Sequence, residues 1–291
     1  MIVIKNCDMS QYTSFKAGGK ADVLMMPEHV SELREALAQL SESQSAYMVM
    51  GNGSNILVRD SGYVGTIVKV GEAFSHITVD GDELTVGAGA LMPTVAKMAM
   101  EAGLVGFEFA SGIPGSIGGA VFMNAGAYGS EMKDIIQSVH LVSKDGSKEF
   151  TMRADDMAFS YRHSILYETG DVVTGVTLKL RQGSIEEIKE KTRELTKLRN
   201  EKQPVSLPSA GSFFKRPDGY FAGKLIEDAG LKGLSVGGAK VSELHAGFIV
   251  NDKNATATDI IDLMHLVQHT VYDQFGVNLE PEVRIIGDHG V

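Results

Sequence analysis

The sequence predicts an α+β fold in three parts, and three observations lead to this prediction. A segment with helical periodicity stands near the start of the chain, short strand-like segments occupy its middle, and helical periodicity returns in its last third. The length of 291 residues is consistent with two or three domains, at about 100–200 residues per domain.

The first part is expected to contain one surface helix and three short strands. The helix is expected over Met26–Leu40, because Pro27 favours the first turn of a helix and apolar residues then recur every three or four positions. The strands are expected at Ala46–Met50, Ile56–Val58 and Thr66–Val70, with a turn at Gly51–Asn55 between the first two.

Turn and capping residues define the elements of the middle part. Asp-Gly pairs favour tight hairpin turns, proline favours the first turn of a helix, and glycine favours its end. We therefore expect a hairpin at His76–Val86, a helix from Pro93 to Gly103, a hairpin at Val139–Phe150 and a buried strand at Val172–Leu180.

A charged helix and a proline-containing segment precede the last part. Ser184 and Glu187 form a capping-box pattern that starts a helix reaching about Arg199. The two prolines of Gln203–Ser209 predict an extended segment near a domain boundary. Beyond it we expect helices at Phe221–Ala229 and Thr256–Phe275 and strands at Gly247–Asn251 and Leu279–Ile286. The predicted domains are residues 1–70, 71–203 and 204–291.

Amino-acid composition limits which partners the protein is expected to bind and in which cellular compartment it is expected to work. Hydrophobic residues make up 43% and charged residues 22%, which is typical of a globular chain. A net charge of −10 repels phosphate backbones and anionic lipids, so we expect no nucleic-acid or membrane partner. The sequence gives no sign of an obligate protein partner. The single cysteine, Cys7, excludes an internal disulfide and fits a reducing cytoplasm. The first ten residues contain no long apolar segment, which argues against a signal peptide.

The first candidate site is the turn Gly51–Asn55 between two expected strands. Its glycines free backbone N–H groups to point at one anion, in a nest that suits a pyrophosphate. An ordinary Asn-Gly turn would have the same sequence. The turn is not a Walker loop, because no Gly-Lys-Ser/Thr follows it, and it does not open a helix as a Rossmann fingerprint does.

The second candidate site is the charge-free run Phe109–Ser130, which contains six glycines. This much glycine costs backbone entropy, so close approach of a large or phosphorylated cofactor would explain the absence of side chains. Tight packing of a helix against a sheet is the alternative explanation. Two glycine clusters about sixty residues apart suggest that one extended ligand touches both.

Three further motifs favour a structural role when each is taken alone: Ser160–Arg162, Ser209–Pro217 and Leu279–Gly287. On an alternating strand, Glu280, Glu282 and Arg284 would point the same way. His265 and His269 stand at helical i, i+4 spacing, but no third ligand accompanies them, so no metal site is expected.

Taken together and in order, seven motifs make the chain resemble the UDP-N-acetylenolpyruvoylglucosamine reductase family. The resemblance runs from about Thr13 to Gly287, over nearly the whole chain. The matching segments are Gly51–Asn55, Gly112–Ala120, Met123–Gly129, Ser160–Arg162, Ala210–Lys215, His245–Asn251 and Glu282–Val283.

The resemblance implies an FAD-binding fold of the vanillyl-alcohol oxidase type, with two α+β subdomains, followed by a C-terminal α+β substrate domain. It implies that NADPH reduces FAD and that the flavin then reduces the enolpyruvyl ether of a UDP-sugar to a lactyl ether. The short stretch between Arg162 and Ser212 resembles the family form without a tyrosine-bearing loop over the substrate.

The resemblance also implies roles for individual residues. Arg162, Ser212 and Glu282 match the family's catalytic trio, and Lys202 matches a lysine that binds the phosphates of the substrate. Arg216 stands where some members have an asparagine that contacts the nucleotide. FAD contacts are expected at Gly51, Asn52, Gly53, Ser54, Asn55, Gly115, Ser116, Gly118, Gly119, Asn124, Ala125 and Gly126. The other expected substrate contacts are Tyr161, Lys215 and Asn251.

This chemistry fits the residue types. Hydride transfer to the terminal enolpyruvyl carbon leaves negative charge on the adjacent carbon and its carboxylate, which the Arg162 guanidinium can stabilise. Ser212 would protonate that carbon, while Glu282 would act as a protonated group or would orient Arg162 or a water. Two alternatives remain at this point: a flavin oxidase of the same fold class, and a nucleotide-binding module without catalysis.

Overall fold

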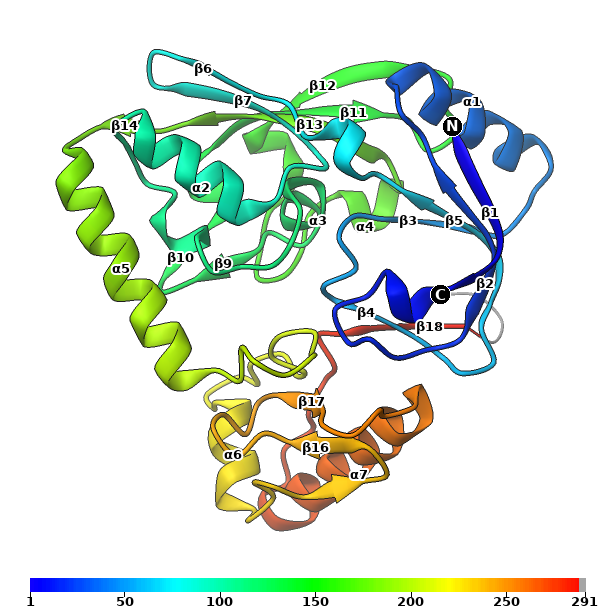
Figure 1. Cartoon of the computed structure of the whole chain (residues 1–291), viewed down its shortest axis with the longest axis vertical. Coiled ribbons are helices and arrows are strands. Elements are labelled where there is room, and N and C mark those ends of the chain that lie inside the picture. Colours follow the sequence, from blue (N-terminus) through cyan, green and yellow to red (C-terminus); the bar gives the residue numbers. More distant parts are fainter. Residues whose placement is uncertain (288–291) are drawn as a thin grey trace. The chain divides into compact units, whose positions relative to one another are not determined.

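The computed structural model describes residues 1–287, which form two compact units (Figure 1). Unit 1 contains Met1–Ile4, Leu24–Asn52 and Thr66–Leu198. Unit 2 contains Lys5–Val23, Gly53–Gly65 and the chain from Arg199 onwards. Each unit has its own hydrophobic core. The expected domain boundaries after residues 70 and 203 stay predictions.

A four-stranded sheet has the order β1-β2-β5-β3. Its strands are β1 (Ile2–Asp8), β2 (Lys20–Met26), β3 (Tyr47–Met50) and β5 (Tyr63–Lys69). β3 and β5 run parallel with Met50 opposite Lys69, so their carboxyl ends adjoin. The expected strands at β3 and β5 are confirmed. β1 and β2 were not expected, because β1 is largely exposed and neither strand has a regular apolar alternation.

The first helix, α1 (Val30–Glu42), is confirmed, but it begins four residues later than expected. His29 at its N-cap has an extended backbone, and Pro27 lies before the helix. The buried side chains Leu33 and Leu37 pack into the core of unit 1. Arg34 on the same helix donates a 3.0 Å hydrogen bond to the carbonyl of Gly146.

Both expected hairpins and the expected buried strand form one antiparallel sheet in unit 1, with the order β12-β11-β13-β7-β6. These strands are β6 (Ile77–Asp80), β7 (Glu83–Gly87), β11 (Ile136–Val142), β12 (Glu149–Arg153) and β13 (Val172–Lys179). The expected helix between Pro93 and Gly103 is α2 (Met92–Glu101), and Gly103 has the positive φ of a helix end.

One helix lies inside the glycine-rich run, where a helix packed against a sheet was only the alternative explanation. This helix, α3 (Ile117–Phe122), packs on the five-stranded sheet against β13 and β7 (Figure 1). The short elements of unit 1 are β8 (Leu104–Val105), β9 (Gly126–Ala127), β10 (Ser130–Glu131), α4 (Leu166–Thr169) and β14 (Arg181–Gln182).

The charged helix is α5 (Ile185–Lys202), which ends three residues beyond the expected position. The Ser184 hydroxyl accepts a hydrogen bond from the Glu187 N–H at 3.4 Å, as expected for an N-cap. The expectation of an extended segment after it is wrong: the Leu207 N–H donates to the Pro204 carbonyl at 3.2 Å. The Val205 N–H also donates to the Gln203 carbonyl at 2.8 Å, so Pro204 lies at the centre of a three-residue turn that the fixed φ of proline favours.

Unit 2 contains a three-stranded antiparallel sheet in the order β15-β16-β17, flanked by two helices (Figure 1). The elements are α6 (Ala222–Asp228), β15 (Ser235–Val236), β16 (Ala239–Val241), β17 (Ile249–Asn251) and α7 (Ala257–Phe275). The two expected helices and the expected strand at β17 are confirmed. A capping box between Thr256 and Asp259 starts α7, and Gly276 ends it in a left-handed conformation.

The expected strand Leu279–Ile286 is only partly correct. β18 covers Arg284–Ile286 and pairs in parallel with β4 (Ile56–Val58), the second of the three strands expected in the first part. Pro281 has no N–H to donate, and it makes only an isolated bridge to Phe214. Alternation of Glu280, Glu282 and Arg284 along one strand is therefore not observed.

Candidate cofactor and active site

The two glycine clusters predicted from the sequence adjoin within unit 1. The side-chain amide of Asn52 donates a 2.6 Å hydrogen bond to the carbonyl of Pro114. A Cβ atom added to Gly51 would lie 2.1 Å from Oγ of Ser116. A side chain at Gly51 would therefore require the Ser116 hydroxyl to move.

A lysine holds the same turn from the neighbouring strand. Nζ of Lys69 donates a 2.8 Å hydrogen bond to the carbonyl of Gly51. The Lys69 side chain is half-buried, and the loss of water around it lowers the pKa of its ammonium group. Sequence reasoning missed Lys69, although a single charged residue at the end of the apolar segment Thr66–Val70 was a usable signal.

Ser116 is the clearest mark of a ligand in this region. Its side chain is 3% exposed, and its hydroxyl has no hydrogen-bond partner among residues 1–287. A buried hydroxyl without a partner costs free energy unless a ligand or water satisfies it. The carbonyl of Gly115 accepts a 3.0 Å hydrogen bond from the Met92 N–H, which fixes the backbone just before Ser116.

Gly118 and Gly119 in α3 have different surroundings. A Cβ atom on Gly118 would lie 3.0 Å from Cβ of Ala88, so this glycine lets the helix approach the sheet. A Cβ atom on Gly119 would meet only Oγ of Ser116, at 3.7 Å. A side chain at 118 would therefore be crowded by Ala88, whereas a Cβ atom at 119 would make only an ordinary van der Waals contact. Packing of the helix against the sheet explains Gly118, and room for a cofactor at Gly119 stays a prediction.

The second half of the first glycine turn belongs to unit 2. Gly53 has a φ of +67°, and an added Cβ atom would lie 2.2 Å from the Tyr12 carbonyl. The side chain of Asn55 donates a 3.0 Å hydrogen bond to the carbonyl of Glu282. Ser54 lies between them and is half-buried. Close approach of the chain to itself thus explains Gly53, and Asn55 connects the turn to the Glu282 segment.

A buried asparagine connects the second glycine cluster to the Arg162 segment. Asn124 is fully buried, and its amide nitrogen donates to the Ser160 carbonyl at 2.9 Å and to Glu131 at 3.0 Å. Its amide oxygen accepts from the Lys133 N–H at 3.0 Å. Asn124 therefore fixes the chain two residues before Arg162.

Arg162 has an unusual backbone conformation, with a φ of +56°. Its guanidinium lies over the Tyr161 ring at 5.0 Å and donates a 3.4 Å hydrogen bond to the Gly126 carbonyl. The neighbouring Ala125 is buried, and its carbonyl accepts from the Met132 N–H at 2.9 Å. A positive φ outside glycine is strained and is kept where the surroundings fix it, commonly at functional sites.

Ser212 and Glu282 lie on adjacent backbone segments of unit 2. The Glu282 N–H donates to the carbonyl of Phe213, the residue after Ser212, at 2.8 Å. The Phe213 N–H donates to the Gly247 carbonyl at 2.8 Å, and the Phe213 ring is completely buried. Ser212 is exposed beside this anchor. The structure thus brings two members of the predicted trio together within one unit.

The four predicted substrate residues of unit 2 have different environments. Lys202 is the exposed last residue of α5. Lys215 forms an ion pair with Glu280, and the Arg216 guanidinium lies 4.0 Å from the centre of the Phe221 ring. Asn251 is 7% exposed, and its amide group bonds to the Phe15 carbonyl at 2.9 Å and to the Ala255 N–H at 2.7 Å. These substrate contacts stay predictions.

His245 is a half-buried ionisable group to which sequence reasoning gave no role of its own. Its Nδ1 accepts a 3.1 Å hydrogen bond from the Gly247 N–H, and burial lowers its pKa. Cβ atoms added to Gly223 and Gly247 would lie 3.2 and 2.9 Å from its Cε1 atom. The ring therefore lies in a narrow space between two glycines.

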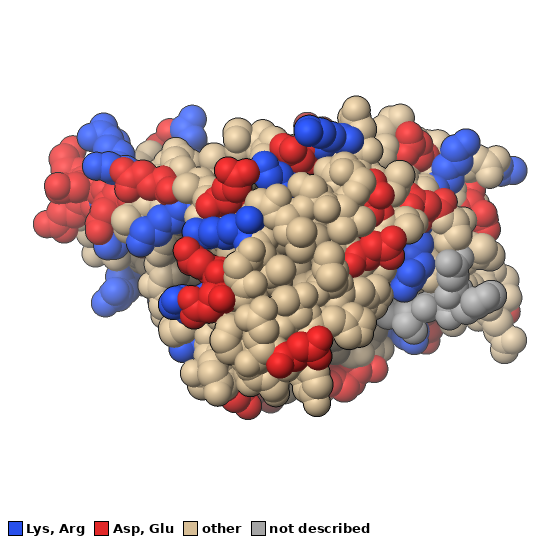
Figure 2. Space-filling view, turned by 90° about the horizontal axis from the view of Figure 1, so that it is seen from below, with Lys and Arg blue, Asp and Glu red and all other residues tan. Residues whose placement is uncertain are grey.

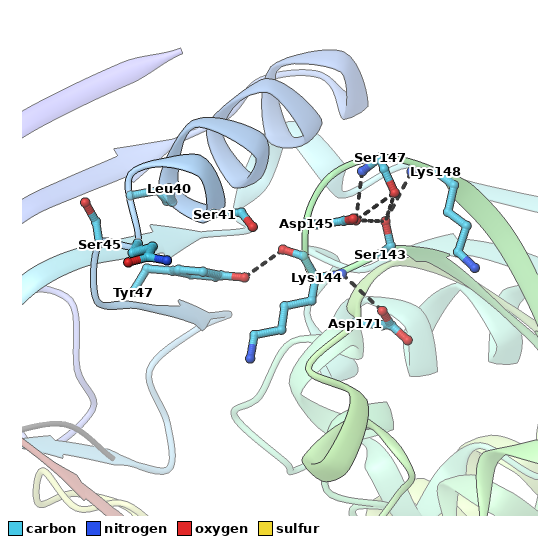
Figure 3. Close-up of a pocket in the computed structure, with 11 residues that line it drawn as sticks. Leu40, Ser41, Ser45, Tyr47, Ser143, Lys144, Asp145, Ser147, Lys148 and Asp171 are labelled. Atoms are coloured by element: carbon cyan, nitrogen blue, oxygen red, sulfur yellow. Dashed lines mark hydrogen bonds between the residues drawn. The ribbon is translucent and has the colours of Figure 1, made fainter.

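A hollow of about 780 Å³ lies elsewhere in unit 1, between the end of α1 and the β11–β12 hairpin (Figure 3). The Tyr47 hydroxyl donates to the Lys144 carbonyl at 2.7 Å, and the Lys144 N–H donates to Asp171 at 3.1 Å. The hydroxyls of Ser143 and Ser147 donate to Asp145 and hold the pKa of this carboxyl at about 2. None of the sequence-predicted site residues lines this hollow.

The surface shown in Figure 2 carries charged side chains of both signs. On the face seen in Figure 2, basic and acidic side chains are interspersed around a centre with few charges. Among residues 1–287, no group of three His, Cys, Asp or Glu side chains could hold a metal ion. Within the same residues, no helix combines the length and apolar character needed to cross a membrane.

The fold and the glycine site define an FAD-binding protein: residues 21–149 match the model of an FAD binding domain. Residues 203–286 match the C-terminal domain of UDP-N-acetylenolpyruvoylglucosamine reductase. The reductase of Alkaliphilus oremlandii is 49% identical over 99% of this chain and 94% of that protein. This chain belongs to the UDP-N-acetylenolpyruvoylglucosamine reductase family, so the family and the α+β FAD-binding fold expected from the sequence are confirmed.

Solved structures give the same result. The UDP-N-acetylenolpyruvylglucosamine reductase of Thermus caldophilus is similar with a TM-score of 0.85 and 37% identity, over 98% of both chains. The glucose dehydrogenase Phl p 4.0202 is similar over 61% of this chain and 39% of its own, with a TM-score of 0.50 and 17% identity. This second likeness is one of fold alone.

The residues of unit 1 fit the FAD that the family requires. The turn at Gly51 and Asn52 is surrounded by the Ser116 hydroxyl, which has no partner within residues 1–287, by the uncrowded Gly119 and by the Lys69 ammonium. An anionic diphosphate needs hydrogen-bond donors and positive charge, and these groups supply both. These residues would hold FAD in unit 1, and the individual FAD contacts stay predictions.

Proposed function

We propose that this chain reduces the enolpyruvyl ether of UDP-N-acetylenolpyruvoylglucosamine to the lactyl ether of UDP-N-acetylmuramate, with NADPH as the reductant. The supporting observation is its 49% identity over 99% of the chain to a curated reductase, together with the hydrogen bond from the Glu282 N–H to the carbonyl of Phe213, the residue after Ser212. The substrate is a small molecule, and we place the reaction in the cytoplasm, where a single unpaired cysteine is stable.

Bound FAD, once NADPH has reduced the flavin, supplies the hydride that the terminal enolpyruvyl carbon receives. The chain supplies the proton and stabilises the charge that develops on the adjacent carbon. Arg162 provides a guanidinium for the substrate carboxylate, which spreads this negative charge. Ser212 gives its hydroxyl proton to the adjacent carbon, and Glu282 returns a proton to Ser212. The double bond thereby becomes a single bond, with one hydride and one proton added.

The phosphates of the UDP group require cations in a chain whose net charge is −10. We assign this role to Lys202, Lys215 and Arg216, which lie in unit 2 with Ser212. The Arg216 guanidinium is already held over the Phe221 ring, so less side-chain entropy is lost when it binds.

The test is a two-step experiment on the purified full chain without oxygen. The protein should be yellow, NADPH should bleach its flavin absorbance, and the enolpyruvyl substrate should restore the colour while gaining two hydrogens by mass spectrometry. A protein that binds no FAD would contradict the proposal. A bleached flavin that oxygen reoxidises but the enolpyruvyl substrate does not would instead identify an oxidase.

A further inference from the structure

Lys69 and Gly51 mark the carboxyl ends of two adjacent parallel strands. Met50, the last residue of β3, lies opposite Lys69, the last residue of β5. In sheets with parallel strands, ligands bind outside the carboxyl ends of the strands. The 2.8 Å hydrogen bond from Nζ of Lys69 to the Gly51 carbonyl places the ammonium against the first glycine turn.

The charge of Lys69 has no counter-charge within residues 1–287. Among residues 1–287, no carboxylate lies within 4.0 Å of its nitrogen. A half-buried ammonium without a carboxylate is unfavourable, and its burial indeed lowers its pKa. A lysine ammonium has three donors, and the Gly51 carbonyl uses one of them. Two donors and one full positive charge remain for a ligand.

The neighbouring groups indicate that this ligand is an anion. The buried Ser116 hydroxyl, which also has no partner within the described chain, adjoins the same glycine, since a Cβ atom on Gly51 would lie 2.1 Å from it. Both groups can donate, and no carboxylate of the described part of the chain forms an ion pair with Lys69 at the turn. An anionic group with several acceptor oxygens would satisfy the hydroxyl and the ammonium together.

We propose that Lys69 binds the diphosphate of FAD and that its bond to the Gly51 carbonyl holds the glycine turn in the conformation that receives the diphosphate. Lys69 is then a cofactor-binding residue that supplies charge, where the glycines supply space. This proposal rests on FAD as the resident cofactor. It does not depend on the identity of the substrate or on the roles of Arg162, Ser212 and Glu282.

The test compares flavins with and without phosphate on the full chain stripped of its flavin. Lys69→Met keeps the aliphatic stem and removes the charge, and Lys69→Arg keeps the charge. Lys97→Met, at an exposed lysine of α2, is the matched control. Fluorescence titration should give a dissociation constant for FAD that is roughly 10–100-fold higher in Lys69→Met. The constant for riboflavin, which has no phosphate, should change less than about twofold.

Two further comparisons decide between ligand binding and a purely structural role. Added salt should weaken FAD binding more in the wild type and Lys69→Arg than in Lys69→Met, because screening acts on the charge pair. If Lys69→Met weakens FAD and riboflavin equally, Lys69 only holds the turn and the proposal fails. Unchanged FAD affinity also overturns it. If Lys69→Met does not fold by circular dichroism, Lys69→Gln and Lys69→Arg give the same FAD-to-riboflavin comparison.

Discussion

The side-chain amide of Asn124 donates a 2.9 Å hydrogen bond to the main-chain carbonyl of Ser160, across 36 positions of sequence. This bond joins the second glycine cluster to the segment that carries Arg162. Arg162 has a φ of +56°, a conformation that persists only where surrounding contacts fix it. Asn124 therefore acts on Arg162 through the backbone and is a positioning residue.

Replacing Asn124 with alanine should slow the substrate half-reaction more than the flavin half-reaction. The Ser160 carbonyl, Glu131 and the Lys133 N–H all lose a buried partner, which destabilises the fold by about 1–3 kcal/mol. We expect flavin reduction by NADPH to change less than about threefold, and substrate-dependent reoxidation to slow roughly 10–100-fold, measured by stopped-flow absorbance.

The control for this prediction is Asn6→Ala, at an exposed asparagine whose φ of +49° is close to the +45° of Asn124. It carries the same backbone cost without the buried amide contacts, and both half-reactions should stay near wild type. Equal slowing of both half-reactions in Asn124→Ala would show that Asn124 supports the flavin site or the whole unit, and not the Arg162 segment.

Gly118 and Gly119 should respond in opposite ways to alanine. At Gly118 the added methyl would press against Ala88, so Gly118→Ala should lower the melting temperature of the flavin-free chain. At Gly119 the methyl has space, and alanine favours a helix over glycine by up to about 1 kcal/mol. Gly119→Ala should therefore match or exceed wild-type stability without flavin, yet bind FAD at least about tenfold more weakly. Normal FAD affinity in Gly119→Ala would mean that the open space is not used by the cofactor.

Local patterns in the sequence were sufficient to predict most of the helices and strands. The turns at Gly81 and Gly146 and the helix ends at Gly103 and Gly276 depend on glycine's positive φ, so neighbouring residues determine them. β1 was missed because its exposed face carries no apolar alternation. α3 was missed because packing against Ala88 overrides the low helix propensity of its glycines.

The candidate site was predicted in its residue types and less well in its contacts. The motifs identified Ser212, Glu282 and Arg162, but no local pattern indicates that the Asn124 amide bonds to Ser160. Lys69 was missed for the same reason. Its significance depends on the parallel pairing of β3 and β5, which places it beside Gly51 although 18 positions separate them.

Asp60 should stabilise unit 2 in a pH-dependent way. Its carboxylate accepts hydrogen bonds from the Ala257 N–H at 3.0 Å and the Thr258 N–H at 2.7 Å, at the start of α7. Burial opposes ionisation, but the bonds from Thr258 and Ala257 outweigh it and lower the pKa of Asp60. A lowered pKa in the folded state gives stability above the unfolded pKa of about 3.9, and this stability is lost as the pH falls through the folded value.

We therefore expect Asp60→Ala to lower the free energy of unfolding by about 0.5–2 kcal/mol at neutral pH, as the loss of a helix cap does. The difference from wild type should shrink as the pH falls below 4, measured by urea unfolding. Asp262→Ala, at an exposed aspartate within α7, is the control and should show neither effect. A difference for Asp60→Ala that stays constant with pH would mean that its charge does not contribute.

Ser212 should separate the two half-reactions most sharply. Flavin reduction by NADPH needs no proton from this hydroxyl, so Ser212→Ala should bleach at a rate near wild type. Reoxidation by the enolpyruvyl substrate requires protonation of the carbon next to the carboxylate, and it should slow by at least the roughly 10²–10⁴-fold typical of a general acid. Ser212→Cys keeps a transferable proton and should recover part of the loss.

Ser209→Ala, three residues earlier on the segment that bridges to Val250, is the control and should leave both rates near wild type. Equal slowing of both half-reactions in Ser212→Ala would assign Ser212 to positioning, and Glu282, which pairs with the next residue, would become the proton donor to test.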